Sequence, residues 1–196
     1  MLARVSFLLF ACALLATPAA AQSSAVQLPL FDGALVLHGE VGILADARTD
    51  TSADIEVWRP VLFGTPERPI GGRMDCRLGG VTRVYSEALF DIEQRYRDTL
   101  DRRKAAGLND RETAFTETGA IRRLEVTGTQ RQPTRHYVLT WLALRGETTL
   151  YDIRLNCEFT YLERPGRDTD FAAIMRSHID LAVPDPAPVS AQTEGS

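Results

Sequence analysis

Residues 136–161 constrain the fold more than any other part of the chain. Their second half alternates apolar with polar side chains, and the apolar set is Tyr151, Ile153, Leu155, Cys157, Phe159 and Tyr161. A period of two is typical of a strand with one buried and one wetter face. The first half, residues 137–144, is largely apolar on both faces, which favours a central strand covered on both sides. Gly146 can adopt the positive φ of a tight turn, so the stretch predicts a long β-hairpin.

The segments around this hairpin predict an α+β fold. A strand at 120–129 joins the strands at 136–144 and 149–161 in a C-terminal three-stranded meander. Nearer the N-terminus, we expect two short strands within residues 28–44 with a turn near His38 and Gly39, a strand at 55–63 that Pro60 confines to an edge or interrupts, and a short strand at 73–78. The expected sheet is mostly antiparallel, with two main helices packed on it and one disulfide.

The clearest predicted helix covers residues 86–106. Ser86 is a good N-cap, Gly107 follows the last turn, and apolar residues recur at helical spacing between them. Acid-to-base pairs four residues apart are expected on its surface at Asp91–Arg95, Glu93–Arg97 and Asp98–Arg102. A second helix is expected to start near Asp168 or Thr169, after a polar connection at 109–118.

The layout of these elements resembles that of the α/β/α sandwiches of PsbP-like accessory proteins over roughly residues 55–183. The resemblance lies in the order of elements alone. It implies an accessory role and no particular functional residue.

The N-terminus reads as an export signal. Residues 1–21 combine Arg4, an apolar run and the small residues 19–21, which together predict a secretory signal peptide cleaved before Gln22. Residues 22–183 then form one predicted domain, and residues 184–196 a disordered Pro-rich tail. Of the 22 basic residues only Lys104 is a lysine, which suggests a GC-rich bacterial genome. We therefore expect a protein of the Gram-negative periplasm.

Two cysteines, Cys76 and Cys157, follow the predicted signal peptide. Both lie on the apolar sides of predicted strands, and an even pair in an oxidising compartment favours a disulfide. A redox-active pair is the alternative, but the spacing is not that of a Cys-x-x-Cys motif.

The hairpin face opposite Cys157 is the predicted ligand or partner site. A reversal at Gly146 and Glu147 would pair Leu142 with Tyr151 and Thr140 with Ile153, whereas a one-residue slip would exchange the two faces. The candidate residues on this face are Tyr137, Trp141, Asp152, Arg154 and Asn156. Aromatic rings beside a few polar groups are typical of a small-ligand surface. The alternative is that a helix simply covers Tyr137 to Trp141.

No strong catalytic or metal signature is present in the sequence. The His38-x-Glu40 pair is compatible with a metal on one strand face, but a turn-flanking pair without metal is favoured, and we expect no cofactor. The formal net charge of −4 argues against nucleic acid as a partner, and no segment after the signal peptide predicts membrane insertion.

The leading functional hypothesis is a non-enzymatic binding or accessory protein of the cell envelope, with an envelope protein or a small ligand as its partner. The competing hypothesis is a small periplasmic hydrolase that uses carboxylates such as Asp152 with Glu40 or Glu158.

Overall fold

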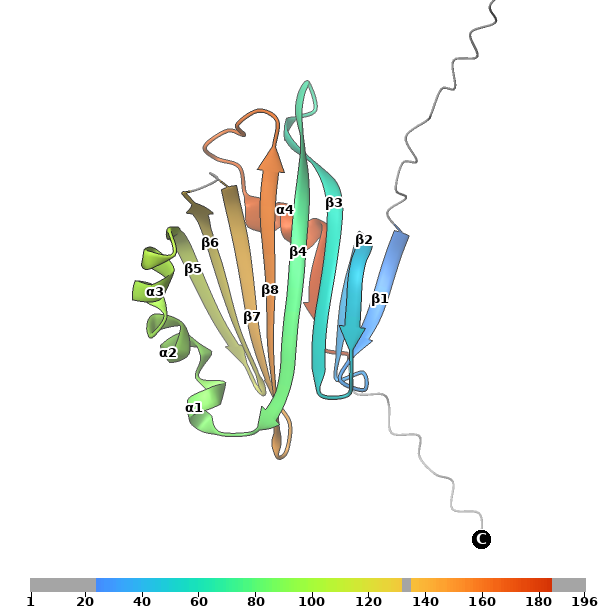
Figure 1. Cartoon of the computed structure of the whole chain (residues 1–196), viewed down its shortest axis with the longest axis vertical. Coiled ribbons are helices and arrows are strands. Elements are labelled where there is room, and N and C mark those ends of the chain that lie inside the picture. Colours follow the sequence, from blue (N-terminus) through green and yellow to red (C-terminus); the bar gives the residue numbers. More distant parts are fainter. Residues whose placement is uncertain (1–23, 132–134, 185–196) are drawn as a thin grey trace, which may run out of the picture.

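The computed structural model describes residues 24–131 and 135–184 of the chain (Figure 1). The predicted signal peptide at 1–21 lies outside the described residues, as does all of the predicted tail except Pro184. Within the described residues, no helix is both long and apolar enough to span a membrane.

Antiparallel strands make up most of the molecule. In chain order the elements are β1 (Ser24–Leu30), β2 (Leu35–Arg48), β3 (Ser52–Thr65), β4 (Arg68–Val84), α1 (Glu87–Phe90), α2 (Ile92–Arg97), α3 (Leu100–Ala105), β5 (Leu108–Thr118), β6 (Ile121–Gln130), β7 (Arg135–Arg145), β8 (Thr149–Tyr161), α4 (Phe171–His178) and β9 (Ile179–Ala182). The strands form a nine-stranded sheet in the order β1-β2-β3-β4-β8-β7-β6-β5, and β9 pairs with β2.

The predicted α+β class is therefore wrong, because the fold is a mostly antiparallel β-sheet with short helices. The expected helix at 86–106 divides into α1, α2 and α3. Asp91 leaves the helical conformation, with ψ of 74°, and its carboxylate caps α2 by accepting the N–H of Gln94 at 3.0 Å. The connection expected at 109–118 is instead β5, and α4 is only eight residues long. These helices cover each sheet face only in part, so they do not build the layers of an α/β/α sandwich.

The N-terminal strands are longer than the sequence predicts. Residues 35–48 form the single strand β2, and the turn before it places Phe31, Asp32 and Gly33 at positive φ. Strand β3 continues through Pro60, because β2 pairs with β3 only as far as Trp58 and Pro60 lies beyond that, on a free edge.

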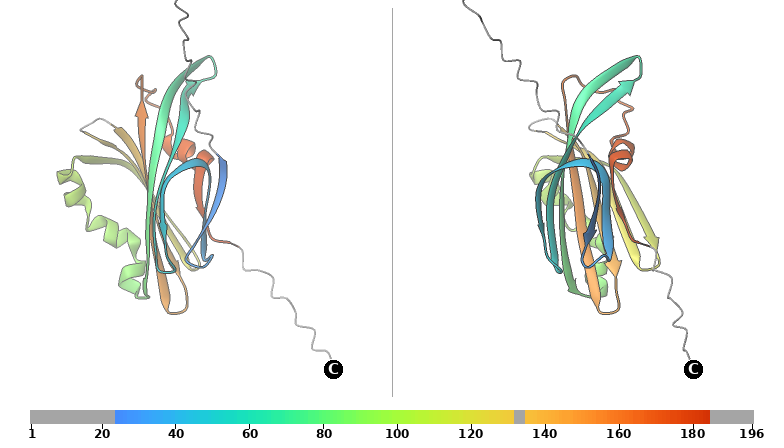
Figure 2. Two further views of the ribbon diagram at one scale, coloured as in Figure 1. Left: turned by 45° about the vertical axis from the view of Figure 1, so that its right-hand side comes forward. Right: turned by 90° about the vertical axis from the view of Figure 1, so that its right-hand side faces the viewer.

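The long strand β2 bends the sheet. Its first half pairs with β1 on one side and β9 on the other, and its second half pairs with β3. Figure 2 shows the resulting curvature, with the β3–β4 hairpin extending beyond the other strands.

Two hydrophobic cores lie on opposite sides of the sheet. The larger core includes Phe159, Met175 and Leu181, and it lies between the sheet, α4 and β9. The smaller core contains Phe90, Ile92 and Trp141 and packs α1 and α2 on the other face. Strand β7 contributes side chains to both cores, as its two apolar faces predict.

The predicted disulfide between Cys76 and Cys157 is confirmed. The two residues are direct partners in the β4–β8 ladder, with Cα atoms 4.0 Å apart. The bridge therefore joins the N-terminal strands to the C-terminal meander in the middle of the sheet.

Candidate functional site

The hairpin of β7 and β8 is shifted by two residues from the predicted pairing. Leu142 pairs with Ile153 and Leu144 with Tyr151, and the turn closes through the Gly146 N–H, which donates to the Thr149 carbonyl at 2.7 Å. A shift of two keeps every side chain on its predicted face, because the side-chain period of a strand is two.

The five candidate residues share the face opposite Cys157 but differ in exposure. Trp141, Tyr137 and Asp152 are buried, Asn156 is half-buried and Arg154 is exposed. Trp141 is only 3% exposed and packs with residues of α1 and α2, so its indole lies beneath the more exposed side chains of this face.

Asp152 is the centre of the arrangement. Its carboxylate is 5% exposed and accepts the indole N–H of Trp141 at 2.6 Å and the Nη2 of Arg95 at 2.6 Å. The Nε of Arg83 lies 3.7 Å from the same carboxylate. One acid thus anchors α2 to β7 and β8 and attracts a second guanidinium from β4.

Arg154 stands next to this ion pair without a carboxylate of its own. Its guanidinium lies 3.9 Å over the Trp141 ring, and the structure shows no hydrogen bond or ion pair for it among the described residues. Partial burial lowers the pKa of Arg154, and the charges of Arg95 and Arg83 lower it further against the raising effect of Asp152. The arginine remains charged at neutral pH and would be stabilised by an anion.

These groups border a cavity of about 600 Å³ on the uncovered part of the sheet. Arg77, Arg83, Asp152 and Arg154 line it together with Gly79 and Gly80. Gly79 pairs with Arg154 across β4 and β8, and a Cβ added there would meet no atom within 4 Å. The missing side chain leaves room beside Arg154. We call Arg83, Asp152 and Arg154 the arginine site.

Tyr137 belongs to a neighbouring cluster. Its hydroxyl donates to Asp110, which also accepts from the hydroxyl of Tyr96 at 2.5 Å and from Arg103 at 2.8 Å. Burial raises the pKa of Asp110, but the hydrogen bonds from Arg103 and Tyr96 outweigh it and hold the pKa below its ordinary value. The structure therefore brings Trp141, Asp152 and Arg154 together and leaves Tyr137 outside.

Sequence reasoning missed Arg83 and Arg95. Arg95 was expected to pair with Asp91, four residues earlier, but that carboxylate caps α2 and Arg95 reaches Asp152 instead. Only the Glu93–Arg97 pair of the three expected pairs forms, at 2.5 Å. Helical spacing identifies local partners, and it carries no signal for a contact across 57 residues.

The carboxylate pairs proposed for a hydrolase are not brought together. Glu158 lies six residues from Asp152 along β8, about 20 Å at strand spacing, and binds Arg135 at 2.8 Å. Glu40 lies on β2 and pairs with Arg59 at 2.9 Å. The described residues contain no cluster of three or more His, Cys, Asp or Glu side chains suited to a metal ion.

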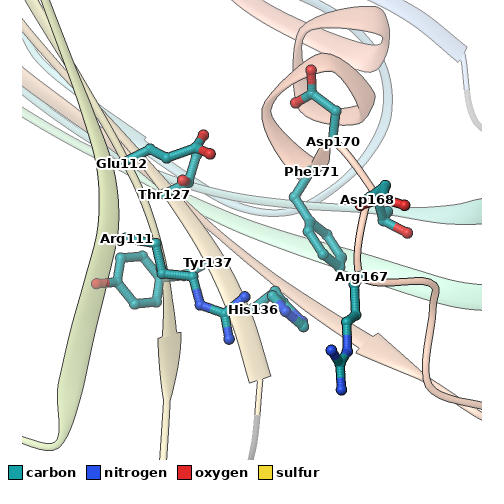
Figure 3. A pocket seen from close by; sticks show the side chains of 11 residues that line it. Arg111, Glu112, Thr127, His136, Tyr137, Arg167, Asp168, Asp170 and Phe171 are labelled. Carbon is teal, nitrogen blue, oxygen red and sulfur yellow. The ribbon is translucent and has the colours of Figure 1, made fainter.

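A second cavity, of about 340 Å³, lies where β5, β6 and β7 meet the loop before α4 (Figure 3). We call it the His136 cavity, and besides His136 its ionisable lining residues are Arg111, Glu112, Arg167, Asp168 and Asp170. The His136 ring stacks on Phe171, with centroids 4.0 Å apart.

Comparison with known proteins gives no match, either to a family model or to a curated protein.

Proposed function

We propose that this protein is a non-enzymatic binding protein of the cell envelope that takes an anionic ligand or partner at the arginine site. The anion is a carboxylate or a phosphate, because both are groups that a guanidinium binds through two parallel hydrogen bonds. The proposal rests on two features, the predicted export signal at residues 1–21 and the unpaired charge of Arg154 on the open face of the sheet.

The observation that carries the proposal is the balance of charge around Asp152. Three guanidinium groups, those of Arg83, Arg95 and Arg154, surround this one carboxylate. Arg95 already occupies the carboxylate, so Arg154 and the half-exposed Arg83 retain donors that face a cavity large enough for a small molecule.

The state of Asp152 favours binding over hydrolysis. A general acid or nucleophile needs a carboxylate that is free to exchange a proton or attack a substrate. Both oxygens of Asp152 instead accept short hydrogen bonds, from Trp141 and from Arg95. Asp152 therefore has a structural role, which is compatible with a rigid surface beneath a bound ligand.

Analysis of bound small molecules tests this proposal. The full chain is purified under native conditions, denatured, and the released compounds are identified by mass spectrometry. We expect the wild-type protein and Arg77→Gln to release the same anionic compound, and the double variant Arg83→Gln, Arg154→Gln to release none. Arg77 is the matched control, since it lines the same cavity but is already paired with Asp54 at 2.7 Å.

Release of one compound by all three proteins, or of neutral and cationic compounds alone, would contradict the proposal.

Export to the periplasm is tested separately. Cell fractionation and intact mass should find the protein in the periplasm with Gln22 as its first residue. A mature protein that retained residues 1–21 would refute the cleavage.

A further inference from the structure

We propose that the His136 cavity binds a small zwitterion of the α-amino acid class. The ammonium group is placed by carboxylates at one end of the cavity, and the carboxylate group by guanidinium groups at the other. This inference concerns a site distinct from the arginine site and does not depend on the proposed function.

Unpartnered arginines gather around this cavity. Among the described arginines, Arg102, Arg111, Arg154, Arg164 and Arg167 show neither an ion pair nor a hydrogen bond. Arg111 and Arg167 line the cavity, and the charges of Arg111 and Arg164 act on His136. Most other described arginines have a carboxylate partner, so the two free guanidinium groups that line the cavity favour an anion there.

Two acids of the cavity, Glu112 and Asp170, lie apart from these arginines. Figure 3 shows the carboxylates of Glu112 and Asp170 on one side and the guanidinium groups of Arg111 and Arg167 on the other, with the Phe171 ring between them. Asp170 caps α4 through the N–H of Ala173 at 2.8 Å. Glu112 has no hydrogen-bond or ion-pair partner among the described residues, so the acidic side also retains binding capacity.

A β-bulge places opposite charges at the same cavity. Asp110 pairs with Gly128 and Glu112 with Thr127, which makes Arg111 the extra residue of β5. In a regular strand the side chains of Arg111 and Glu112 would point to opposite faces. The bulge redirects one of them, and both line the cavity. A bulge that brings an acid and a base to one site matches a ligand that carries both charges.

The size and walls of the cavity suit an amino acid. Its volume of about 340 Å³ lies at the small end of the range for ligand sites. The Phe171 ring, which stacks on His136, provides an apolar surface between the two charged ends. We therefore choose L-phenylalanine as the probe.

Nuclear magnetic resonance titration of the ¹⁵N-labelled protein tests the proposal with three probes. L-Phenylalanine carries both charges, N-acetyl-L-phenylalanine lacks the ammonium group, and L-phenylalaninamide lacks the carboxylate. We expect L-phenylalanine to shift the backbone amide signals of Thr127, His136 and Phe171 saturably. Each derivative should bind roughly tenfold more weakly, since a lost charged hydrogen bond costs about 1.5 kcal/mol or more.

Variants assign the two ends of the site. Glu112→Gln should weaken the binding of L-phenylalanine roughly tenfold and leave the affinity for N-acetyl-L-phenylalanine unchanged. Arg111→Gln should weaken the binding of L-phenylalanine and leave the affinity for L-phenylalaninamide unchanged. Both side chains are exposed on the edge strand β5, so the fold should tolerate the changes. Arg102→Gln, at another arginine without a carboxylate partner, is the control and should change nothing.

Two results would overturn the proposal. The first is equal affinity for L-phenylalanine and its N-acetyl derivative, which would mark a simple anion site. The second is the absence of saturable shifts up to about 10 mM, beyond which binding of a small ligand is very weak.

Discussion

Trp141 on β7 donates its indole N–H to Oδ1 of Asp152 on β8, at 2.6 Å. Arg95 of α2 reaches Oδ2 of the same carboxylate, also at 2.6 Å. The carboxylate therefore ties a helix to the centre of the sheet, and the indole that it orients lies beneath the guanidinium of Arg154. Stability and the proposed binding site depend on the same group.

Replacement of the central acid should destabilise the protein. Asp152→Asn keeps an oxygen for Trp141 but leaves Arg95 without its counter-charge, and loss of one member of a buried ion pair costs about 3 kcal/mol. Urea unfolding measures this loss. Asp54→Asn breaks the exposed pair with Arg77 and should have a far smaller effect. Equal losses in the two variants would show that Asp152 is not a structural centre.

The indole donor can be removed separately. Trp141→Phe leaves Oδ1 of Asp152 without the N–H and should cost about 1–3 kcal/mol of unfolding free energy. The matched control is Trp58→Phe, because Trp58 also lies under an arginine, with the Arg73 guanidinium 4.9 Å from the ring, but is only half-buried. We expect a clearly larger loss for Trp141→Phe by urea unfolding, and similar losses would argue against the Trp141–Asp152 bond.

The disulfide should be a major source of stability. Cys76 and Cys157 are 81 residues apart in sequence, and the chain-entropy model gives about 4 kcal/mol for closure of such a loop. Cys76→Ala with Cys157→Ala should lower the unfolding free energy by up to that amount. A reductant should destabilise the wild-type protein similarly and leave the double variant unchanged. Retention of full stability in the double variant would contradict this.

The pH dependence of stability should report on His136. Burial lowers the pKa of His136, and the charges of Arg111 and Arg164 lower it further. The unfolded chain regains the ordinary value of about 6.5, so it binds the proton more readily than the folded chain does. The contribution of neutral His136 to the unfolding free energy is present above about pH 6.5, and it is lost as pH falls through the folded-state pKa.

Unfolding free energies between about pH 7.5 and 5 test this sign. The wild-type protein should lose stability more steeply than His136→Gln as pH falls. Identical slopes for wild type and His136→Gln would refute the assignment.

The alternation of residues 151–161 identified the hairpin, its two faces and the position of Cys157. The same pattern could not fix the register, because a shift of two residues leaves both faces unchanged. Strand β5 was missed because an exposed edge strand has no apolar face to produce alternation. None of its residues is buried, and most are exposed.

The predicted helix failed at Asp91, where a capping carboxylate interrupts an otherwise regular apolar stripe. Of the site, the sequence placed Trp141, Asp152 and Arg154 on one face. Arg83 and Arg95 could not be predicted, because their contacts with Asp152 depend on tertiary structure.

Direct observation of the arginine side chains during anion titration tests the central claim. The Nε–H signals of Arg83, Arg154 and Arg77 are followed in the ¹⁵N-labelled protein as inorganic phosphate or succinate is added at constant ionic strength. We predict saturable shifts at Arg83 and Arg154 with at least one of the two anions, no comparable shift at Arg77, and roughly tenfold weaker binding to Arg154→Gln. Uniform small shifts at all three arginines, or an unchanged affinity in Arg154→Gln, would contradict a binding site at Arg83, Asp152 and Arg154.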